Sequence, residues 1–194
     1  MRSAGTSSKQ QIKDTKNDQE FELDRVMKFC AVSDRPLHET RDALVVCRYG
    51  LIYSKESVIE ALLERKQEKN NSLGKHVRSL KGLYAVRFQW NEETPVCPVT
   101  SRSLNGQIAA FALISDRSDI GVNVLSQHGI EQIGKDLEDE YGPIKRKIRL
   151  APPPDELKAI RASIIAERNE RKRAKKDRES SAECKPSPHK QSKH

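Results

Sequence analysis

Apolar and polar positions between residues 42 and 69 predict a β-hairpin followed by a helix. The apolar runs Ala43–Cys47 and Leu51–Tyr53 are interrupted at Gly50, a pattern typical of two short strands joined by a tight turn. Ser54 is a good helix cap, and the residues after it predict a helix to about residue 69. The apolar stripe of this helix is Val58, Ile59, Leu62 and Leu63.

A second apolar segment predicts one long strand over Leu83–Trp90. Tyr84, Val86, Phe88 and Trp90 alternate with other residues and would share one face of it. We expect this strand to join the elements that precede it to those that follow.

The chain contains an internal repeat. Residues Cys30–Leu37 and Cys97–Leu104 share the pattern C-x-V-[ST]-x-R-x-L, 67 positions apart. Each copy precedes an apolar strand, Ala43–Cys47 in the first and Ile108–Ile114 in the second, and then an amphipathic helix, which spans about residues 126–137 in the second. This order predicts an α+β fold in which two small loop–hairpin–helix units pack together.

The expected organisation has five parts. The polar start and the Ser- and Lys-rich end of the chain have compositions typical of disorder, and three prolines separate the second unit from a basic helix. The predicted parts are a disordered tail at 1–20, a first unit at 21–82, a second unit at 83–150, a proline linker with a basic helix at 151–178, and a disordered tail at 179–194.

The charge of the chain is distributed unevenly. Its 194 residues carry a net charge of +8. Residues 1–144 contain 20 basic and 21 acidic side chains, whereas residues 145–194 contain 16 basic and 7 acidic ones. We therefore interpret the body as nearly neutral and exclude a uniformly basic nucleic-acid-binding globule.

Several other classes of protein are excluded by the same inspection. No apolar run is long enough for a membrane helix, and the first twenty residues have no secretory apolar region. The cysteines at 30, 47, 97 and 184 form no closely spaced pair, so we expect free thiols in a reducing compartment. There is no phosphate-binding glycine loop and no catalytic triad signature, so we assign no catalytic residue.

The repeated loops carry the first set of candidate residues, Val32, Arg35, Val99 and Arg102. In one interpretation the two arginines only brace their loops through backbone carbonyl groups. In the other, the four side chains rim a shallow surface for a protein partner. The cysteines of the loops are most simply explained as small buried side chains.

The basic helix carries the second set. An apolar stripe covers its first turns, and a dense group of cations follows. This group is either a solvated charge run or a functional one, and its function would be a nuclear-import signal or a weak, non-specific contact with nucleic acid. Its members are Arg168, Arg171, Lys172, Arg173, Lys175, Lys176 and Arg178.

Four segments in order, FCAVSDRPL, VVCRYGLIYSKESVIEALL, HVRSLKGL and VCPVTSRSLNG, resemble the replication termination factor 2 family. The resemblance extends from about Phe29 to Lys176. It implies that the two units are similar to U-box and RING domains, and that the loops of Val32 and Val99 dock partners as the corresponding loops of those domains do.

The second unit departs from the zinc-binding pattern of that family. The family pattern resembles Cys-Pro, Cys-Gly-x-Val and Cys-x-x-Cys, and of these cysteines only Cys97 is present here. Residues 98–183 contain one histidine, His128, and no cysteine, whereas zinc takes about four nitrogen or sulfur ligands. We therefore expect no metal and no other cofactor.

The resemblance implies a nuclear, monomeric adaptor of the replication machinery that acts in fork pausing, termination and stability. Its expected partners are replisome proteins, including the sliding clamp, and no membrane. Two alternatives stay open. One is a ubiquitin or SUMO ligase that recruits a conjugating enzyme and needs no nucleophile of its own, and the other is a spliceosome-associated factor in pre-mRNA splicing.

Overall fold

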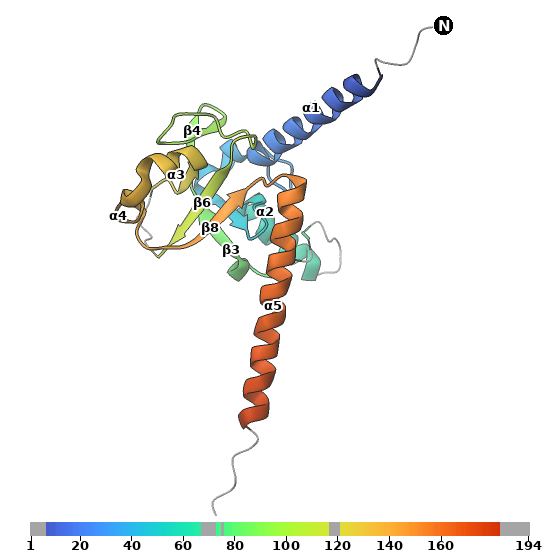
Figure 1. Ribbon diagram of the computed structural model, residues 1–194, viewed down its shortest axis with the longest axis vertical. Coiled ribbons are helices and arrows are strands. Elements are labelled where there is room, and N and C mark those ends of the chain that lie inside the picture. Colours follow the sequence, from blue (N-terminus) through green and yellow to red (C-terminus); the bar gives the residue numbers. More distant parts are fainter. Residues whose placement is uncertain (1–6, 67–72, 75, 117–120, 183–194) are drawn as a thin grey trace, which may run out of the picture. The chain divides into compact units, whose positions relative to one another are not determined.

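The computed structural model describes residues 7–66, 73–74, 76–116 and 121–182, which form helices and small antiparallel sheets (Figure 1). The chain divides into two units, Met1–Pro153 and Pro154–His194, which are described here separately. In the first unit, helices and three sheets alternate along the chain, so the predicted α+β class is confirmed.

The first sheet follows the first repeated loop. A 3-10 helix, η1 (Leu37–Ala43), leads into β1 (Leu44–Cys47), which pairs antiparallel with β2 (Ile52–Ser54). Gly50 takes a φ of +80° in the turn between them. Helix α2 (Lys55–Lys66) follows as predicted, and the sheet order is β2–β1–β3.

The second sheet has the order β7–β6–β8 and follows the second loop. Strands β6 (Ala110–Ser115) and β7 (Val124–Ser126) pair antiparallel, and β8 (Ile144–Leu150) pairs with the other side of β6. Ser126 caps α3 (Gln127–Ile133) by accepting a hydrogen bond from the Gly129 N–H at 3.0 Å. The 3-10 helix η3 (Gly134–Asp136) and helix α4 (Leu137–Tyr141) complete the connection to β8.

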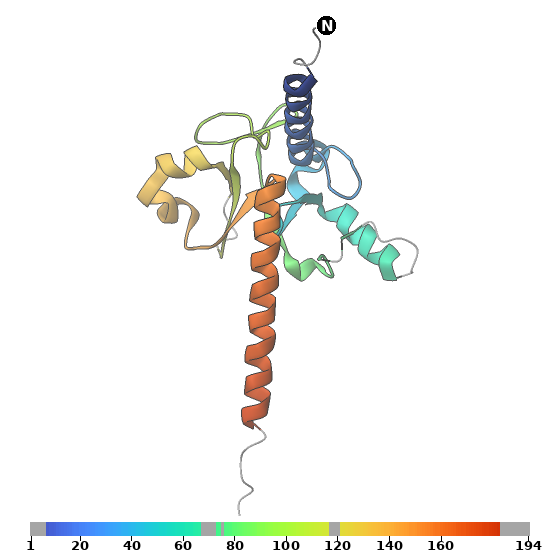
Figure 2. The same cartoon turned by 45° about the vertical axis from the view of Figure 1, so that its right-hand side comes forward.

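The internal repeat is visible in the strand register. Leu44 pairs with Ser54 on one side and Val86 on the other, and Ala110 pairs in the same way with Ser126 and Leu150. Each sheet therefore has its first strand in the centre and its helix directly after its second strand. Figure 2 shows α2 and α3 on opposite sides of the first unit, with the sheets between them.

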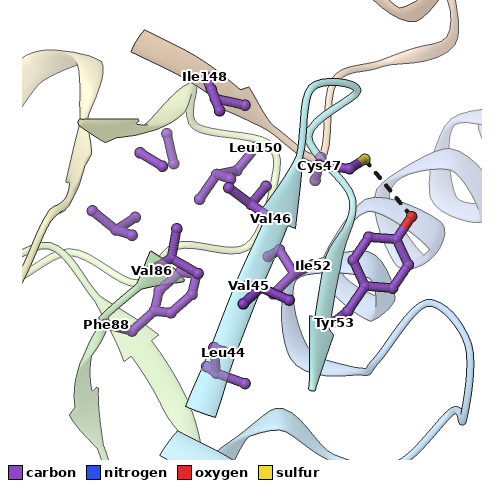
Figure 3. Close-up of a cluster of buried hydrophobic side chains, with 14 of the residues drawn as sticks. Leu44, Val45, Val46, Cys47, Ile52, Tyr53, Val86, Phe88, Ile148 and Leu150 are labelled. Atoms are coloured by element: carbon purple, nitrogen blue, oxygen red, sulfur yellow. Dashed lines mark hydrogen bonds between the residues drawn. The ribbon is translucent and has the colours of Figure 1, made fainter. Parts of the chain in front are cut away.

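The two repeats share one hydrophobic core. Val46 and Val86 of the first sheet point toward Ile148 and Leu150 of the second, and all four side chains are buried (Figure 3). Burial of apolar area is the main favourable contribution to folding. Each repeat therefore depends on the other for part of its stability.

The prediction of one long strand over Leu83–Trp90 is wrong in one respect, because the structure divides this segment into two strands. Strand β3 (Leu83–Val86) pairs with β1, whereas β4 (Gln89–Asn91) forms a separate hairpin with β5 (Thr94–Val96). The physical reason lies at Arg87, whose main-chain N–H and C=O are both hydrogen-bonded to Asn123. Because β3 belongs to the first sheet, the first repeat extends to Val86 rather than ending at residue 82.

The start of the chain also differs from the expectation of a disordered tail at 1–20. Helix α1 extends over Ser7–Lys28, while residues 1–6 lie outside the described residues. Met27 is fully buried, and Leu23 and Val26 pack against the same core. Packing of the last turns offsets the cost of ordering this helix.

The C-terminal unit of the structure, Pro154–His194, begins with helix α5 (Pro154–Ala182). Pro154 occupies the first helical position, where its missing N–H costs no hydrogen bond. The helix continues past residue 178, so the first four residues of the predicted 179–194 tail are helical, and 183–194 lie outside the described part. Among the described residues, no helix combines the length and apolar character needed to cross a bilayer.

The boundary between the units changes the charge balance. Residues 145–149 belong to β8, so the unit ending at Pro153 contains 24 basic and 21 acidic residues, a net charge of +3. The remaining 41 residues contain 12 basic and 7 acidic ones, a net charge of +5. The folded unit is therefore more positive than the near-neutral body that the division at residue 144 indicated.

Candidate docking loops

The two repeated segments form loops with the same main-chain hydrogen bonds. In loop 1 (Cys30–Leu37), the Cys30 N–H donates to the Arg35 carbonyl at 2.9 Å and the Asp34 N–H donates to the Cys30 carbonyl at 3.0 Å. Asp34 has a φ of +55°, a conformation that Asp adopts more readily than most residues.

Loop 2 (Cys97–Leu104) reproduces this geometry. The Cys97 N–H donates to the Arg102 carbonyl at 2.9 Å, the Ser101 N–H donates to the Cys97 carbonyl at 2.9 Å, and Ser101 has a φ of +53°. The leucines that end the loops, Leu37 and Leu104, are both fully buried. The sequence pattern thus describes one loop structure that occurs twice.

The loop cysteines fasten each loop to its own sheet. The Cys30 thiol accepts a hydrogen bond from the Ser54 N–H at 3.4 Å, and the Cys97 thiol accepts one from the Ser126 N–H, also at 3.4 Å. Ser54 and Ser126 are equivalent residues at the ends of β2 and β7. Cys30, Cys47 and Cys97 are free and buried, which confirms the prediction of small buried side chains.

The surroundings of the thiols shift their pKa values in different directions. Burial raises the pKa of Cys97, but the Ser126 and Thr100 hydroxyls and N–H groups outweigh it and lower the pKa to about 7. Burial also opposes the hydrogen bonds at Cys30, where the net pKa shift is downward. At Cys47 burial dominates and raises the pKa, despite the Tyr53 hydroxyl 3.7 Å from its sulfur.

The start of each helix is fitted to its loop. A Cβ atom at Gly129 of α3 would lie 2.9 Å from the Cys97 sulfur and 3.4 Å from the Val99 Cβ, so glycine allows close approach. At the corresponding place in α2, the Ser57 hydroxyl donates instead to the Ser33 hydroxyl at 3.0 Å. Loop 2 therefore sits directly on its helix, whereas loop 1 is joined to its helix by a polar contact.

Helix α1 contacts loop 1 through an ion pair. A single guanidinium nitrogen, Arg25 Nη2, donates to both carboxylate oxygens of Asp34, at 2.7 and 2.6 Å. Two residues earlier, Leu23 lies against Gly106, just after loop 2. Only loop 1 has this ion pair with α1 among the described residues.

The four predicted docking residues lie two on each loop. Val32 is partly buried against the core, whereas the Val99 side chain is 37% exposed. Arg35 and Arg102 are exposed, and within the described part of the chain their guanidinium groups make no hydrogen bond or ion pair. It is their main-chain carbonyl groups that brace the loops, so the arginine side chains are free for a partner.

The described residues contain no group of three or more His, Cys, Asp or Glu side chains arranged to hold a metal. The Cys97 sulfur is surrounded instead by serine and threonine donors. Hydrogen bonds therefore support loop 2 at the cysteine that the family pattern assigns to zinc.

The seven candidate cations of the tail all lie on α5. Arg168 and Arg173 have exposed side chains. The described structure assigns these two no fixed carboxylate partner, which is compatible with both interpretations of the charge run.

Helix α1 and the residue Asn123, which joins the two repeats, were not predicted. Helix α1 could have been found, because Leu23, Val26 and Met27 have the i, i+3, i+4 spacing of a buried helical face. Asn123 carries no such signal. Its side chain accepts from the Arg87 N–H at 2.7 Å and donates to the Ala85 and Leu113 carbonyls, so it joins both repeats.

Comparison with known protein families identifies the family of this chain. A family model described as Rtf2 RING-finger matches residues 6–194 of the chain. The chain belongs to the Rtf2 family. The resemblance to replication termination factor 2 that the loop segments indicate is thereby confirmed.

Relatives of this chain include replication termination factor 2 of Mus musculus, 30% identical over 114 residues, and that of Bos taurus, 29% identical over the same length. Each match covers 47% of this chain and 36% of the relative. Splicing factor rtf2 of Schizosaccharomyces pombe is 24% identical over 142 residues, which is 70% of this chain and 55% of that protein. The matches thus span between about a third and just over half of these relatives.

Proposed function

We propose that this chain is a nuclear adaptor of the replication machinery, acting in fork pausing, termination and stability. Its two repeats would act as U-box/RING-like modules whose loops bind partner proteins. The observation that carries the proposal is the pair of matching loops, each of which holds an exposed, unpaired arginine on a fixed main-chain frame, with an exposed valine, Val99, in loop 2. The family and the names of its mammalian members support the link to replication termination.

The chemistry of the loops favours protein binding over catalysis. Their cysteines are buried and hydrogen-bonded, which suits a structural role better than that of a nucleophile. Exposed Val99 and Arg102 provide a small apolar contact beside a cation. Such a pair fits a partner surface with an apolar pocket next to a carboxylate.

The test is partner identification from nuclear extract with the full chain and two matched variants. The first variant, Val99→Arg with Arg102→Glu, alters loop 2. The second, Leu63→Arg with Lys66→Glu, also replaces an apolar side chain by arginine and a cation by glutamate, at exposed positions of α2. We expect replisome proteins, including the sliding clamp, to be lost with the loop variant and kept with the α2 variant. Equal recovery by both variants would contradict the role of loop 2.

A splicing role is the second candidate, because the fission yeast relative that aligns with 70% of the chain is named a splicing factor. The same experiment separates the two roles. If the wild-type chain recovers spliceosomal proteins and the loop 2 variant does not, the splicing role is supported in place of the replication role.

A ligase role would use the same loops to recruit a ubiquitin- or SUMO-conjugating enzyme. An autoubiquitination assay with a panel of conjugating enzymes tests it. Activity that disappears in Val32→Arg and Val99→Arg would contradict a pure adaptor, whereas no activity with any enzyme supports the adaptor.

The cations of α5 are proposed to direct nuclear import and to contact nucleic acid weakly. Reversing the charges at residues 171–173 and 175–176 should leave a fluorescent fusion in the cytoplasm. Unchanged nuclear retention would contradict the import role.

A further inference from the structure

Strand β8 is an unusually basic edge strand. Four of its seven residues are cations, and in the sheet order β7–β6–β8 it pairs on one side only, with β6. Lys145 and Lys147 are exposed, and Arg146 and Arg149 are half-buried. These four cations produce the positive balance of the folded unit.

The four cations of β8 are distributed over both faces of the sheet. From Arg146 to Leu150 successive residues point to opposite faces, so Lys147 and Arg149 share one face and Arg146 lies on the other. The pairing with β6 shifts between Ile114 and Ser115, where Lys145 is an extra residue of β8, so the alternation is broken at Lys145. Residues two apart on a strand are separated by about 6.7 Å. Cations from both faces therefore flank the unpaired edge of β8, and an extended polyanion lying along that edge would meet them.

Both arginines of β8 lie over half-buried aromatic rings. The Arg146 Cζ is 6.0 Å from the centre of the Tyr84 ring, and the Arg149 Cζ is 5.8 Å from that of Phe111. Cation–π contacts hold a guanidinium in place without neutralising its charge. The rings also provide aromatic surface beside the cations, as in proteins that bind single-stranded nucleic acid.

The charges of β8 are only partly compensated. The Lys145 Nζ lies 2.5 Å from an Asp116 carboxylate oxygen, and both side chains are largely exposed. Within the described part of the chain, Arg146 and Lys147 form no ion pair. Two cations of β8 thus lack a carboxylate partner among the described residues.

We propose that β8 binds the phosphodiester backbone of single-stranded nucleic acid. This surface belongs to the folded unit, is distinct from the cations of α5, and goes beyond the adaptor role. Lysines on an edge strand also prevent strands of two molecules from pairing. That role needs charge alone, whereas β8 also holds its arginines over aromatic rings.

The test is fluorescence anisotropy with a labelled single-stranded oligonucleotide and the full chain, titrated at several salt concentrations. The β8 variant combines Lys145→Gln, Arg146→Gln and Lys147→Gln. The control combines Lys55→Gln, Lys66→Gln and Lys135→Gln, which removes the same charge at exposed positions of α2 and η3. The cations of α5 are unchanged in both.

We expect the β8 variant to bind about 10-fold or more weakly, and the slope of log K against log[salt] to shrink by about 2, because three phosphate contacts are lost. The control should lose much less. Asp116→Asn should tighten binding, since it removes a carboxylate that competes for Lys145. Lys147→Gln alone should reduce the slope by about 0.7, and it changes one exposed side chain that the fold does not need.

Equal affinity and equal salt dependence for the β8 and control variants would overturn the proposal. Self-association of the β8 variant, measured by light scattering, without loss of binding would also overturn it. That result would mean that the lysines serve to prevent β8 strands of two molecules from pairing. An equal loss with a duplex of the same sequence would overturn the assignment to single strands.

Discussion

Cys97 and Ser126 illustrate at the scale of single residues how loop 2 is held. The Ser126 hydroxyl caps α3 through the Gly129 N–H and also lies 3.2 Å from the Cys97 sulfur, while the Ser126 N–H donates to the same sulfur. One serine therefore links the helix, the end of β7 and the loop. The lowered pKa of the thiol is a consequence of this arrangement.

The low pKa of Cys97 predicts that stability depends on pH. The pKa lies at about 7 in the folded chain against 9.0 for an unperturbed thiol, so the folded state loses its proton first. The stabilisation is fully present above pH 9 and is lost as the pH falls through 7. We expect the free energy of unfolding, measured with denaturant, to rise by about 1–2 kcal/mol between these values.

The matched variants for this prediction are Cys97→Ala and Ser126→Ala. The first should abolish the rise. The second should raise the pKa of Cys97, because a donor to the thiolate is lost, and move the transition to higher pH. An identical pH profile in the wild type and Cys97→Ala would contradict the prediction.

Helix α1 illustrates at the scale of elements how packing decides order. Its last turns bury Met27 and pair Arg25 with loop 1, whereas Phe21 is 70% exposed. The sequence assigned these residues to the folded part of the chain and only residues 1–20 before them to disorder, and it predicted no helix over either segment. The spacing of the buried face was present in the sequence, but only the core with which it packs makes the helix stable.

Met27→Ala tests whether α1 is an integral part of the fold. We expect it to lower the free energy of unfolding by about 2–5 kcal/mol, because a fully buried side chain leaves a cavity. Phe21→Ala on the same helix should change stability by less than about 0.5 kcal/mol. Similar small effects of both variants, measured by denaturant unfolding, would mean that α1 does not pack on the core.

Two reciprocal contacts join the repeats at the scale of the whole folded unit. The residue after the first repeat's third strand, Arg87, accepts from the Asn123 N–H at 3.1 Å, just before β7. Ala151, which follows β8, donates to the Gly50 carbonyl at 3.1 Å, just before the second strand of the first repeat. Each repeat therefore attaches its last strand to the hairpin of the other.

Gly50→Ala tests the second of these contacts. A Cβ atom there would lie 2.0 Å from the Arg149 carbonyl oxygen, and the φ of +80° adds backbone strain. We expect a loss of about 3 kcal/mol or more in the free energy of unfolding. Gly82→Ala, where no heavy atom lies within 4 Å, is the control and should be nearly neutral. A neutral Gly50→Ala would show that the repeats do not meet at this turn.

The shared core predicts that both repeats unfold together. In calorimetry of the full chain, we expect one main transition whose van't Hoff and calorimetric enthalpies agree. Val46→Ala and Leu150→Ala, on facing sheets, should both shift that same transition. Two separate transitions, each shifted by one variant, would mean that the repeats are independent domains.

The sequence by itself determined the local elements: the two hairpins, their helices, the basic helix and the repeated loops with buried cysteines. Each of these follows from spacing and turn chemistry among near neighbours. The tertiary structure alone decided the division of the segment after Leu83 into two strands, the hydrogen bonds of Asn123 to both repeats, the packing of α1 on the core and the pairing of β8 with β6. These depend on contacts between residues far apart in the chain, and no local pattern encodes such contacts.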